Sequence, residues 1–411
     1  MQEKRKNIQL ILGILLLGGL LWSRALLSIT IGLWLIYALA CLPGYSKALL
    51  KNPLLIWSFA PLLLVLTGMY PQPFAADNLQ LLLTFCVYPV AGLAALASEK
   101  YSFTKTIAAW WIHAAFIAML YPLGWFALHM AETITQYGSG KSLPVFMDND
   151  HLRFGIFLCS ALLLSLLPGN TLRYPKAASI LILASILLLS VRTAWVMSFI
   201  IIAGYIVHRI TANKAFKKVW MIRSAAAAVL ILTAFWVLPT ANQKIRYTIY
   251  DWQQFNSKGY DSSYSDGVRR AVNSVAWKAI QTQRSTAIGW QAVPTVINKN
   301  FRKQFNGNST GFGWPFNQWL FWWMGSGWWG MALFTGWLFY PAWYGWRNKN
   351  PFLILWTLAI AASCLVECTL NYQFGALLHV WPLVLVWTME RNKASVLPDT
   401  LTKDPVISEI E

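Results

Sequence analysis

Residues 177–210 read AASILILASILLLSVRTAWVMSFIIIAGYIVHRI, two apolar runs interrupted near the middle by a single cation, Arg192. Each run is close to the length that a helix needs to cross the hydrocarbon core of a bilayer. The polar connection at Arg192-Thr193 leaves room only for a tight turn between the two runs. This stretch therefore predicts a pair of membrane helices with Arg192 held at the turn that joins them.

Apolar runs of this kind recur along the whole chain, which is 57% hydrophobic and only 12% charged. Such a composition is typical of polytopic membrane proteins and argues against a soluble enzyme with one anchor. The sequence predicts an all-α polytopic membrane protein with about twelve transmembrane helices and one large, partly helical loop. We expect spans near residues 8–23, 25–42, 54–70, 79–98, 106–130, 152–168, 177–191, 194–210, 224–239, 317–345, 352–370 and 373–389.

The Lys and Arg residues of the short loops set the orientation of these spans. If the basic N-terminus is cytoplasmic, most short-loop cations also fall on the cytoplasmic side. The outward short connections keep only Arg24, Lys141, Arg153 and Arg192. The first apolar stretch lacks a small-residue cleavage site before Arg24, so we interpret it as a retained helix. Both termini are therefore expected inside and the segment 240–316 outside.

The segment 240–316 interrupts the apolar pattern and carries ten Lys and Arg residues against three Asp residues. A basic, water-exposed module beside a membrane bundle indicates an anionic partner at the bilayer surface. The segment divides the chain into an N-terminal bundle over 1–239 with about nine spans, the loop, C-terminal spans over 317–390 and a tail over 391–411. We expect the loop to carry part of the active site.

Ionisable residues at the ends of spans are functional candidates, because charge is costly among apolar helices. Arg192 is either an interfacial arginine or a cation that grips phosphate. His151 opens a span from the outside and is either an interfacial histidine or a proton acceptor. Glu367, at the outer end of another span, needs a partner such as Arg192 or Arg153.

A metal site is not expected. Asp148 and Asp150 form an acid-x-acid pair of the kind that holds a divalent cation on a nucleotide-sugar, but such a pair also caps helices. Cys364 and Cys368 share a helix face without His or acidic partners in a thiolate pattern, so we expect them to pack as small apolar residues. We predict neither a metal nor a cofactor.

Two stretches of the outer segment resemble the O-antigen ligase and polymerase superfamily. Residues 265–280 (SDGVRRAVNSVAWKAI) resemble its pattern of an arginine heading a helix that ends in Trp-x-x-Ala, and Gly289 supplies the glycine turn that follows. Residues 315–320 (PFNQWL), followed by a Gly-x-x-Gly at 327–330, resemble its re-entry into the membrane. The family's usual His before the motif Asn is Phe316 here, so any imidazole base must come from the helix bundle.

Three shorter motifs extend the resemblance. Residues 190–193 (SVRT) resemble the family's turn between adjacent spans. Residues 151–154 (HLRF) and 367–375 (ECTLNYQFG) look like the branch common in Bacteroidetes-type bacteria. The resemblance in architecture covers the chain from about residue 54 to residue 390.

The resemblance implies a metal-independent glycosyltransferase that moves a glycan from an undecaprenyl-pyrophosphate carrier to an acceptor hydroxyl. It implies O-antigen ligation to lipid A-core in lipopolysaccharide assembly, at the bacterial inner membrane, with the large loop in the periplasm. The alternatives are an O-antigen polymerase, a protein O-oligosaccharyltransferase, a lipid-linked glycan transporter and an inactive homologue that binds the carrier. The expected partners are the donor, a lipid A-core or other glycan acceptor and membrane lipid, with no nucleic acid.

The reaction needs cations where charge develops on the departing phosphate, and arginine suits this because its planar fork bonds phosphate oxygens bidentately. We expect Arg192 and Arg269 to form the phosphate-binding pair, with Arg270 as the alternative to Arg269. Adjacent helical residues point about 100° apart, so only one of these two should face the site. His151 is the expected general base and Asp266 the second choice. Further substrate-binding residues are expected at Arg153, Trp314, Phe316, Asn317 and Glu367.

Overall fold

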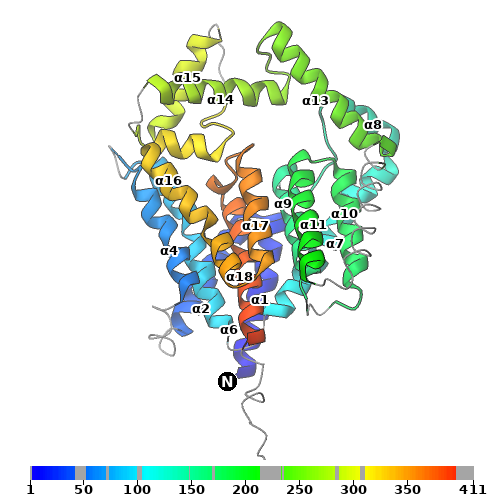
Figure 1. Cartoon of the computed structure of the whole chain (residues 1–411), viewed down its shortest axis with the longest axis vertical. Helices are drawn as coiled ribbons and strands as arrows, with labels where there is room; N and C mark the ends of the chain where they lie inside the picture. The colour runs from blue at the N-terminus through cyan, green and yellow to red at the C-terminus, as the bar shows by residue number, and fades with distance from the viewer. Residues whose placement is uncertain are drawn as a thin grey trace, which may run out of the picture.

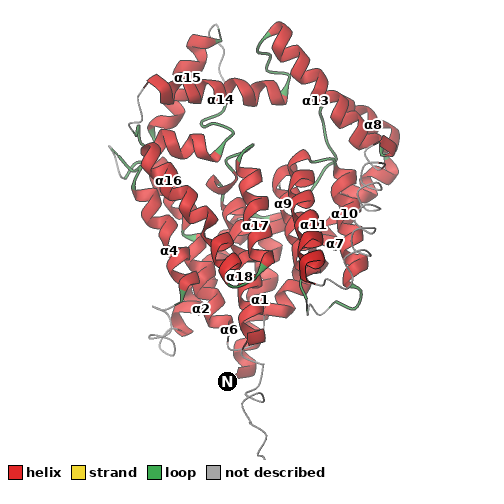
Figure 2. Cartoon of the chain, viewed as in Figure 1, coloured by secondary structure: helices red, strands yellow, loops and turns green. Residues whose placement is uncertain are grey.

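The computed structural model describes residues 2–41, 52–70, 74–99, 104–147, 149–168, 172–212, 233, 236–282, 287–305 and 311–394. Within these ranges every regular element is a helix (Figures 1 and 2). The first half contains α1 (Gln2–Trp22), α2 (Arg24–Cys41), α4 (Pro53–Leu66), α5 (Ala76–Phe85), α6 (Val87–Glu99), α7 (Thr104–Leu128), α8 (Met130–Gly138), α9 (His151–Leu166), α10 (Pro175–Leu189) and α11 (Arg192–Ala212). The second half contains α13 (Pro239–Lys258), α14 (Ser265–Thr282), α15 (Ala292–Gln304), α16 (Gln318–Arg347), α17 (Pro351–Cys364), the short 3-10 helix η3 (Thr369–Asn371) and α18 (Gln373–Ala394).

The helices follow the apolar runs of the sequence closely, with three differences. The run expected over 79–98 is divided at Cys86 between α5 and α6. The helix expected over 352–370 ends at Cys364, and a polar turn with η3 leads into α18. α16 bends at Gly327, whose φ of 74° lies outside the helical region. The span expected over 224–239 lies mostly outside the described residues.

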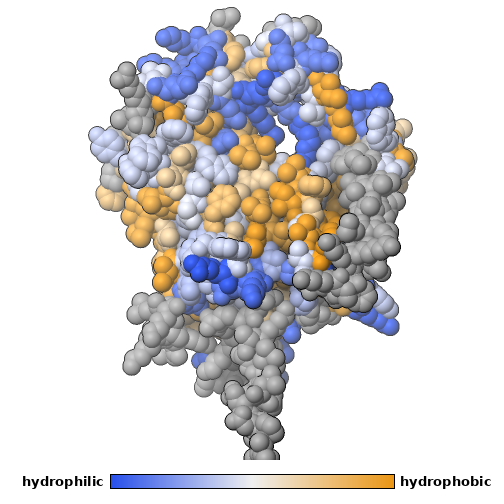
Figure 3. Space-filling model, viewed as in Figure 1, coloured by the Kyte–Doolittle hydropathy of each residue, from blue (hydrophilic) through white to orange (hydrophobic). Residues whose placement is uncertain are grey.

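Five of the described helices are long and apolar enough to cross a membrane: Glu3–Trp22, Arg24–Cys41, Ala76–Ala97, Thr104–Leu128 and Arg192–Thr211. Large apolar side chains on several helices point outward, among them Ile36, Leu63, Leu83 and Phe199, each more than 60% exposed. Figure 3 shows the apolar surface as a band between hydrophilic ends. Exposed apolar surface of this extent is suited to lipid, so the fold is that of an α-helical membrane protein.

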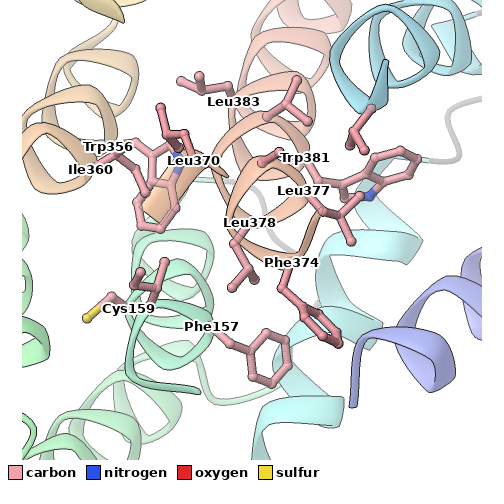
Figure 4. Packing of buried hydrophobic residues seen from close by; sticks show 14 of the residues in the cluster. Phe157, Cys159, Trp356, Ile360, Leu370, Phe374, Leu377, Leu378, Trp381 and Leu383 are labelled. Atoms are coloured by element: carbon pink, nitrogen blue, oxygen red, sulfur yellow. The ribbon is translucent and has the colours of Figure 1, made fainter. Parts of the chain in front are cut away.

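The centre of the bundle is formed by α9, α17 and α18. Every residue of α9 from Arg153 to Ser165 is buried, as expected for a helix that is apolar on all sides. Figure 4 shows side chains of these helices meeting, with Phe157 of α9, Trp356 of α17 and Leu378 of α18 among them. The first residues of α9 are therefore held by a rigid core.

The helices α13, α14 and α15 lie together at the end of the molecule opposite the N-terminus (Figure 1). α13 packs on α8 and α10, while α14 packs on α13, α15 and α16. The buried side of α14 repeats at helical spacing, with Val268, Ala271, Val272 and Val275 facing inward. This layer covers the end of the bundle at which α9 begins and α17 ends.

Trp290 fastens the layer to the bundle. Its backbone N–H donates to the carbonyl of Gly68, and its indole N–H donates to the carbonyl of Val65 at 2.8 Å. The indole stacks on Phe321 with ring centroids 4.9 Å apart. A Cβ added at Gly68 or at Gly325 would overlap this ring, so two glycines form the slot that receives it.

Candidate active site

A cavity of about 650 Å³ lies between α14 and the end of the bundle. In the space-filling view an opening is visible beneath the arch of α13 and α14 (Figure 3). Four segments line the cavity: the start of α9, the start of α14, the connection from α15 to α16, and the turn between α17 and α18. Its polar and aromatic lining includes Asp150, His151, Arg153, Ser265, Arg269, Trp314, Phe316, Glu367 and Tyr372. The structure thus brings together three site residues expected at the ends of separate spans, His151, Arg153 and Glu367, and three expected in the loop, Arg269, Trp314 and Phe316.

Arg153 is positioned from its own helix terminus. Asp150 caps α9 by accepting the backbone N–H of Arg153 at 3.0 Å, and its other oxygen lies 3.1 Å from Nε of the same residue. The guanidinium lies over the Tyr372 ring, 4.2 Å from its centroid. The Arg153 side chain is only 8% exposed, and its Nη1 has no hydrogen-bond partner among the described residues. A buried donor left unmatched in this way is costly unless a ligand accepts from it.

Arg269 enters the cavity from the outer layer. Its guanidinium carbon lies 5.4 Å from the ring centroid of Phe316, and Nη2 lies 3.6 Å from a carboxylate oxygen of Glu367. Phe316 is itself held because its backbone N–H donates to Oδ1 of Asn273 at 2.7 Å. Asn273 lies one helical turn after Arg269, so a single face of α14 carries both the cation and the residue that places its aromatic support.

Glu367 lies in the turn after α17, outside the helices. The expected partner was Arg192 or Arg153, whereas the ion pair forms with Arg269. Burial raises the pKa of this carboxyl, and the Arg269 guanidinium opposes that shift. At 3.6 Å the pair is a long one, which leaves the guanidinium able to turn toward a stronger acceptor such as phosphate.

The imidazole of His151 has a fixed orientation. Its Nε2 lies 2.6 Å from the carbonyl oxygen of Leu143. Because a carbonyl can only accept, Nε2 carries the hydrogen and the lone pair of the neutral ring is on Nδ1. Burial lowers the pKa of His151 below its ordinary value, the hydrogen bond to Leu143 partly opposes this shift, and the charges of Lys244 and Asp150 act in opposite directions. The ring is therefore neutral near pH 7, as a proton acceptor must be.

Arg192 lies at the turn between α10 and α11, as expected, but its side chain is bound outside the cavity. Both of its terminal nitrogens bind the carboxylate of Asp266, with Nη2 2.7 Å from Oδ1, and Nη1 also donates to Thr248 at 2.9 Å. Arg192 and Asp266 are not among the described residues that line the cavity. The arginine expected to pair with Arg269 on phosphate instead connects α11 to the outer layer. The same pairing occupies both oxygens of Asp266, the second candidate for the base.

The remaining candidates divide between the wall and the surroundings of the cavity. Trp314 lies in the wall, edge-on to Tyr372. Arg270 stacks on Trp252 of α13, 3.8 Å from its centroid, and points away from the cavity. Asn317 caps α16 by accepting the backbone N–H groups of Trp319 and Leu320. For Asn317 the contacts observed are structural ones.

Two further residues that sequence reasoning did not single out shape the site. Both carboxylate oxygens of the buried Asp251 accept backbone N–H groups at the start of α14, from Asp266 at 2.9 Å and Gly267 at 3.0 Å. Tyr372 supplies the ring beneath Arg153. No sequence signal marks the link from Asp251 to a helix that starts fourteen residues later. The spacing of four residues between Arg269 and Asn273, in contrast, could have predicted that the two share one face of α14.

Among the described residues, no group of three His, Cys, Asp or Glu side chains lies close enough to hold a metal ion. Asp148, one member of the acid-x-acid pair, lies outside the described residues. Asp150, the other member, is bound to Arg153 and caps α9.

Comparison with known proteins found one match. A family model described as O-antigen ligase matches residues 177–335, from α10 through the outer layer into α16. No curated protein matches the chain. The match supports the predicted resemblance to the O-antigen ligase superfamily over these residues, while the Bacteroidetes-type branch stays a prediction.

Proposed function

We propose that this chain is a member of the O-antigen ligase superfamily and transfers a glycan from undecaprenyl pyrophosphate to a hydroxyl of lipid A-core. The observation that carries the proposal is the single cavity whose lining includes Arg153, Arg269 and His151. Cations, an oriented base and an aromatic wall are what the transfer of a sugar from a lipid pyrophosphate requires.

The proposal includes the topology on which the chemistry depends. The chain crosses the bacterial inner membrane about twelve times, with both termini in the cytoplasm and residues 240–316 in the periplasm. Two observations support this arrangement. α13, α14 and α15 lie at the end opposite the N-terminus, and an apolar band separates that end from the N-terminal end (Figures 1 and 3). The cavity then opens at the level of the outer headgroups, where a polyprenyl pyrophosphate presents its phosphates.

Arg269 and Arg153 bind the pyrophosphate. Arg269 approaches from the outer layer. Arg153 is fixed to the core through Asp150 and Tyr372. The unmatched Nη1 of Arg153 gains an acceptor when a phosphate oxygen arrives. This pair takes the role expected of Arg192 with Arg269, because Arg192 is bound to Asp266.

His151 removes the proton from the acceptor. Nδ1 accepts the hydroxyl proton while the acceptor oxygen forms a bond to the anomeric carbon. The bond from that carbon to the pyrophosphate oxygen breaks, and undecaprenyl pyrophosphate leaves with the bonding electrons. The imidazolium then returns its proton to water. A pyrophosphate leaving group needs no general acid when two guanidinium groups neutralise it.

The aromatic wall holds the glycan. Trp314, Phe316 and Tyr372 present ring faces and edges on one side of the cavity, on which sugar rings can stack. Phe316 stands where the family usually has His, and its ring supports the Arg269 guanidinium. The replacement therefore moves the base to the bundle, at His151, and keeps the cation in place.

Transfer with purified protein, an undecaprenyl-pyrophosphate glycan and lipid A-core tests the proposal. We expect Arg269→Ala to lower the rate about a hundredfold, because a cation at the developing charge is lost. Arg270→Ala is the matched control, since the adjacent arginine stacks on Trp252 outside the cavity. Equal rates for the two variants would remove the basis of the proposal.

The same assay separates the acceptor classes. We expect product on lipid A-core, and unchanged transfer in the presence of a chelator. Product formed only on a second carrier-linked glycan would identify a polymerase, and product on a protein hydroxyl would identify a protein glycosyltransferase. Either result would replace the acceptor while leaving the roles of Arg269 and His151 to be tested by the same variants.

A further inference from the structure

A second cavity, of about 270 Å³, shares a wall with the first. Arg153 and Tyr372, which stack on each other, line both cavities. The second cavity lies between α2, α5 and the start of α18, and its other cation is Arg24 at the first turn of α2. The proposed transfer uses none of the residues that line only this second cavity.

The lining of the second cavity suits an anion. Two guanidinium groups face it and no carboxylate is among the described residues that line it. The other polar groups there are hydroxyls and amides, including Ser28, Gln80 and Asn371. Two arginines with neutral donors form a set that matches phosphate oxygens in both charge and geometry.

One buried donor that belongs to this cavity alone has no partner among the described residues. It is Nδ2 of Asn371, a residue only 7% exposed. The orientation of the Asn371 amide is set because its Oδ1 accepts from Nε2 of Gln318 at 2.7 Å. Since the unmatched atom is a donor, a ligand that accepts hydrogen bonds suits the cavity.

The mouth of the cavity adjoins the apolar surface. Leu83 of α5 lines the cavity and is 69% exposed, on a helix apolar enough to face lipid. Arg24 is also exposed, at the turn between α1 and α2. A ligand can therefore keep its apolar part along α5 while its anionic head reaches Arg24 and Arg153. A free ion has no apolar part with which to contact α5.

We propose that the second cavity binds the phosphate group of a membrane lipid, held beside the transfer cavity by the shared Arg153. The second step of this proposal rests on the proposed function: the acceptor lipid, held in the second cavity, presents its hydroxyl to His151. The donor and the second lipid then both lie beside the stack of Arg153 on Tyr372.

Native mass spectrometry of the purified full chain tests the assignment without any transfer reaction. With dioleoylphosphatidic acid and dioleoylphosphatidylcholine offered in equal amounts, we expect selective retention of the phosphomonoester lipid. Arg24→Gln should weaken that retention about tenfold, because one charged hydrogen-bonding partner is lost. Gln80→Leu provides a second variant that touches only this cavity, and Arg270→Gln is the matched control with an exposed arginine of the outer layer.

The outcomes separate lipid from free phosphate. If millimolar inorganic phosphate occupies the site and displaces the lipid completely, the site binds phosphate without a preference for lipid. That result would overturn the proposal. Equal retention by the wild type, Arg24→Gln and Gln80→Leu would also overturn it. If the wild type retains the lipid selectively but transfers no glycan, the proposed function fails while this site stands. If transfer occurs, Arg24→Gln should raise KM for the acceptor and leave kcat unchanged.

Discussion

Two of the attachments that hold the outer layer to the bundle use opposite chemistry. Near α15 the attachment is the indole of Trp290 in a slot made by Gly68 and Gly325. Near α13 it is polar, through Asp266 bound to Arg192 and Lys244 bound to the carbonyl of Gly140. A packed aromatic slot tolerates no added atom, whereas partly exposed ion pairs exchange partners at little cost. The comparison indicates that the layer is rigid at Trp290 and adjustable at Arg192.

The largest effect should come from Gly289→Ala at the rigid attachment. Gly289 has a φ of 81°, and an added Cβ would overlap the carbonyl oxygen of Tyr70, which belongs to the backbone and cannot turn aside. We expect loss of folded protein, measured as the monodisperse fraction in detergent. Gly336→Ala is the control, because a Cβ there meets nothing within 4 Å. Normal folding of Gly289→Ala would show that the layer is less rigid at this end than the contacts indicate.

Trp290→Ala should be nearly as severe. It removes one hydrogen bond, from the indole N–H to the carbonyl of Val65, and empties a slot packed on Phe321 and Trp322, which costs about 3–5 kcal/mol for a buried tryptophan. The measurement is the thermal unfolding midpoint in detergent. Trp328→Ala, a change at a partly exposed tryptophan of α16, should shift the midpoint much less. Similar shifts of the midpoint for both variants would mean that packing in the slot stabilises the fold no more than a partly exposed tryptophan does.

Asp251→Ala tests the contact between α13 and α14 that holds the start of α14, where Asp266 meets Arg192. The change leaves two backbone N–H groups of α14 without their acceptors, and loss of a cap costs up to about 2 kcal/mol. The start of α14 should fray, which displaces Arg269 and lowers transfer. Asp251→Asn keeps one acceptor oxygen and should recover part of the loss. A transfer rate in Asp251→Ala equal to that of the wild type would separate the cap from the placement of Arg269.

The sequence predicted the membrane helices well, because a bilayer-length apolar run allows few other structures. It also placed His151, Arg153, Glu367 and Trp314 near enough to the outer face to become cavity residues. It could not assign partners: Arg192 and Asp266 are separated by 74 residues, and nothing local shows that they meet. Helical geometry indicated that only one of Arg269 and Arg270 faces the site. Which of the two does so depends on the position of Trp252 on α13, because Arg270 stacks on that ring.

The polar attachment should also respond to pH where the aromatic one does not. Burial lowers the pKa of Lys244 to about 8, and the nearby Arg192 contributes in the same direction. Asp266 opposes this shift, and Arg269 adds to it. Between pH 8 and the value near 10.5 of an unfolded lysine, the unfolded chain binds a proton that the folded chain has released. Stability should therefore rise with pH in this window, by at most about 1.4 kcal/mol per pH unit.

Lys244→Met supplies the comparison, because it keeps the length of the side chain and removes the charge. Thermal midpoints measured at several pH values should rise from pH 8 to pH 10 more steeply in the wild type than in this variant. Parallel curves would show that Lys244 does not titrate in the window. The aromatic attachment carries no ionisable group, so Trp290→Ala should lower the whole curve without changing its slope.

The smallest effect is expected at Arg192, and it decides what that residue does. Arg192 and Asp266 are both partly exposed, so their ion pair should contribute at most about 1 kcal/mol. If Arg192 acts only through Asp266, the double variant Arg192→Ala with Asp266→Ala should be no less stable or active than either single variant. Transfer should fall severalfold in all three, far less than in Arg269→Ala. An Arg192→Ala rate as low as that of Arg269→Ala, with Asp266→Ala close to the wild type, would instead show that Arg192 leaves Asp266 to bind the donor phosphate. In that case the adjustable attachment would itself be part of the catalytic cycle, with the pyrophosphate competing with Asp266 for one guanidinium.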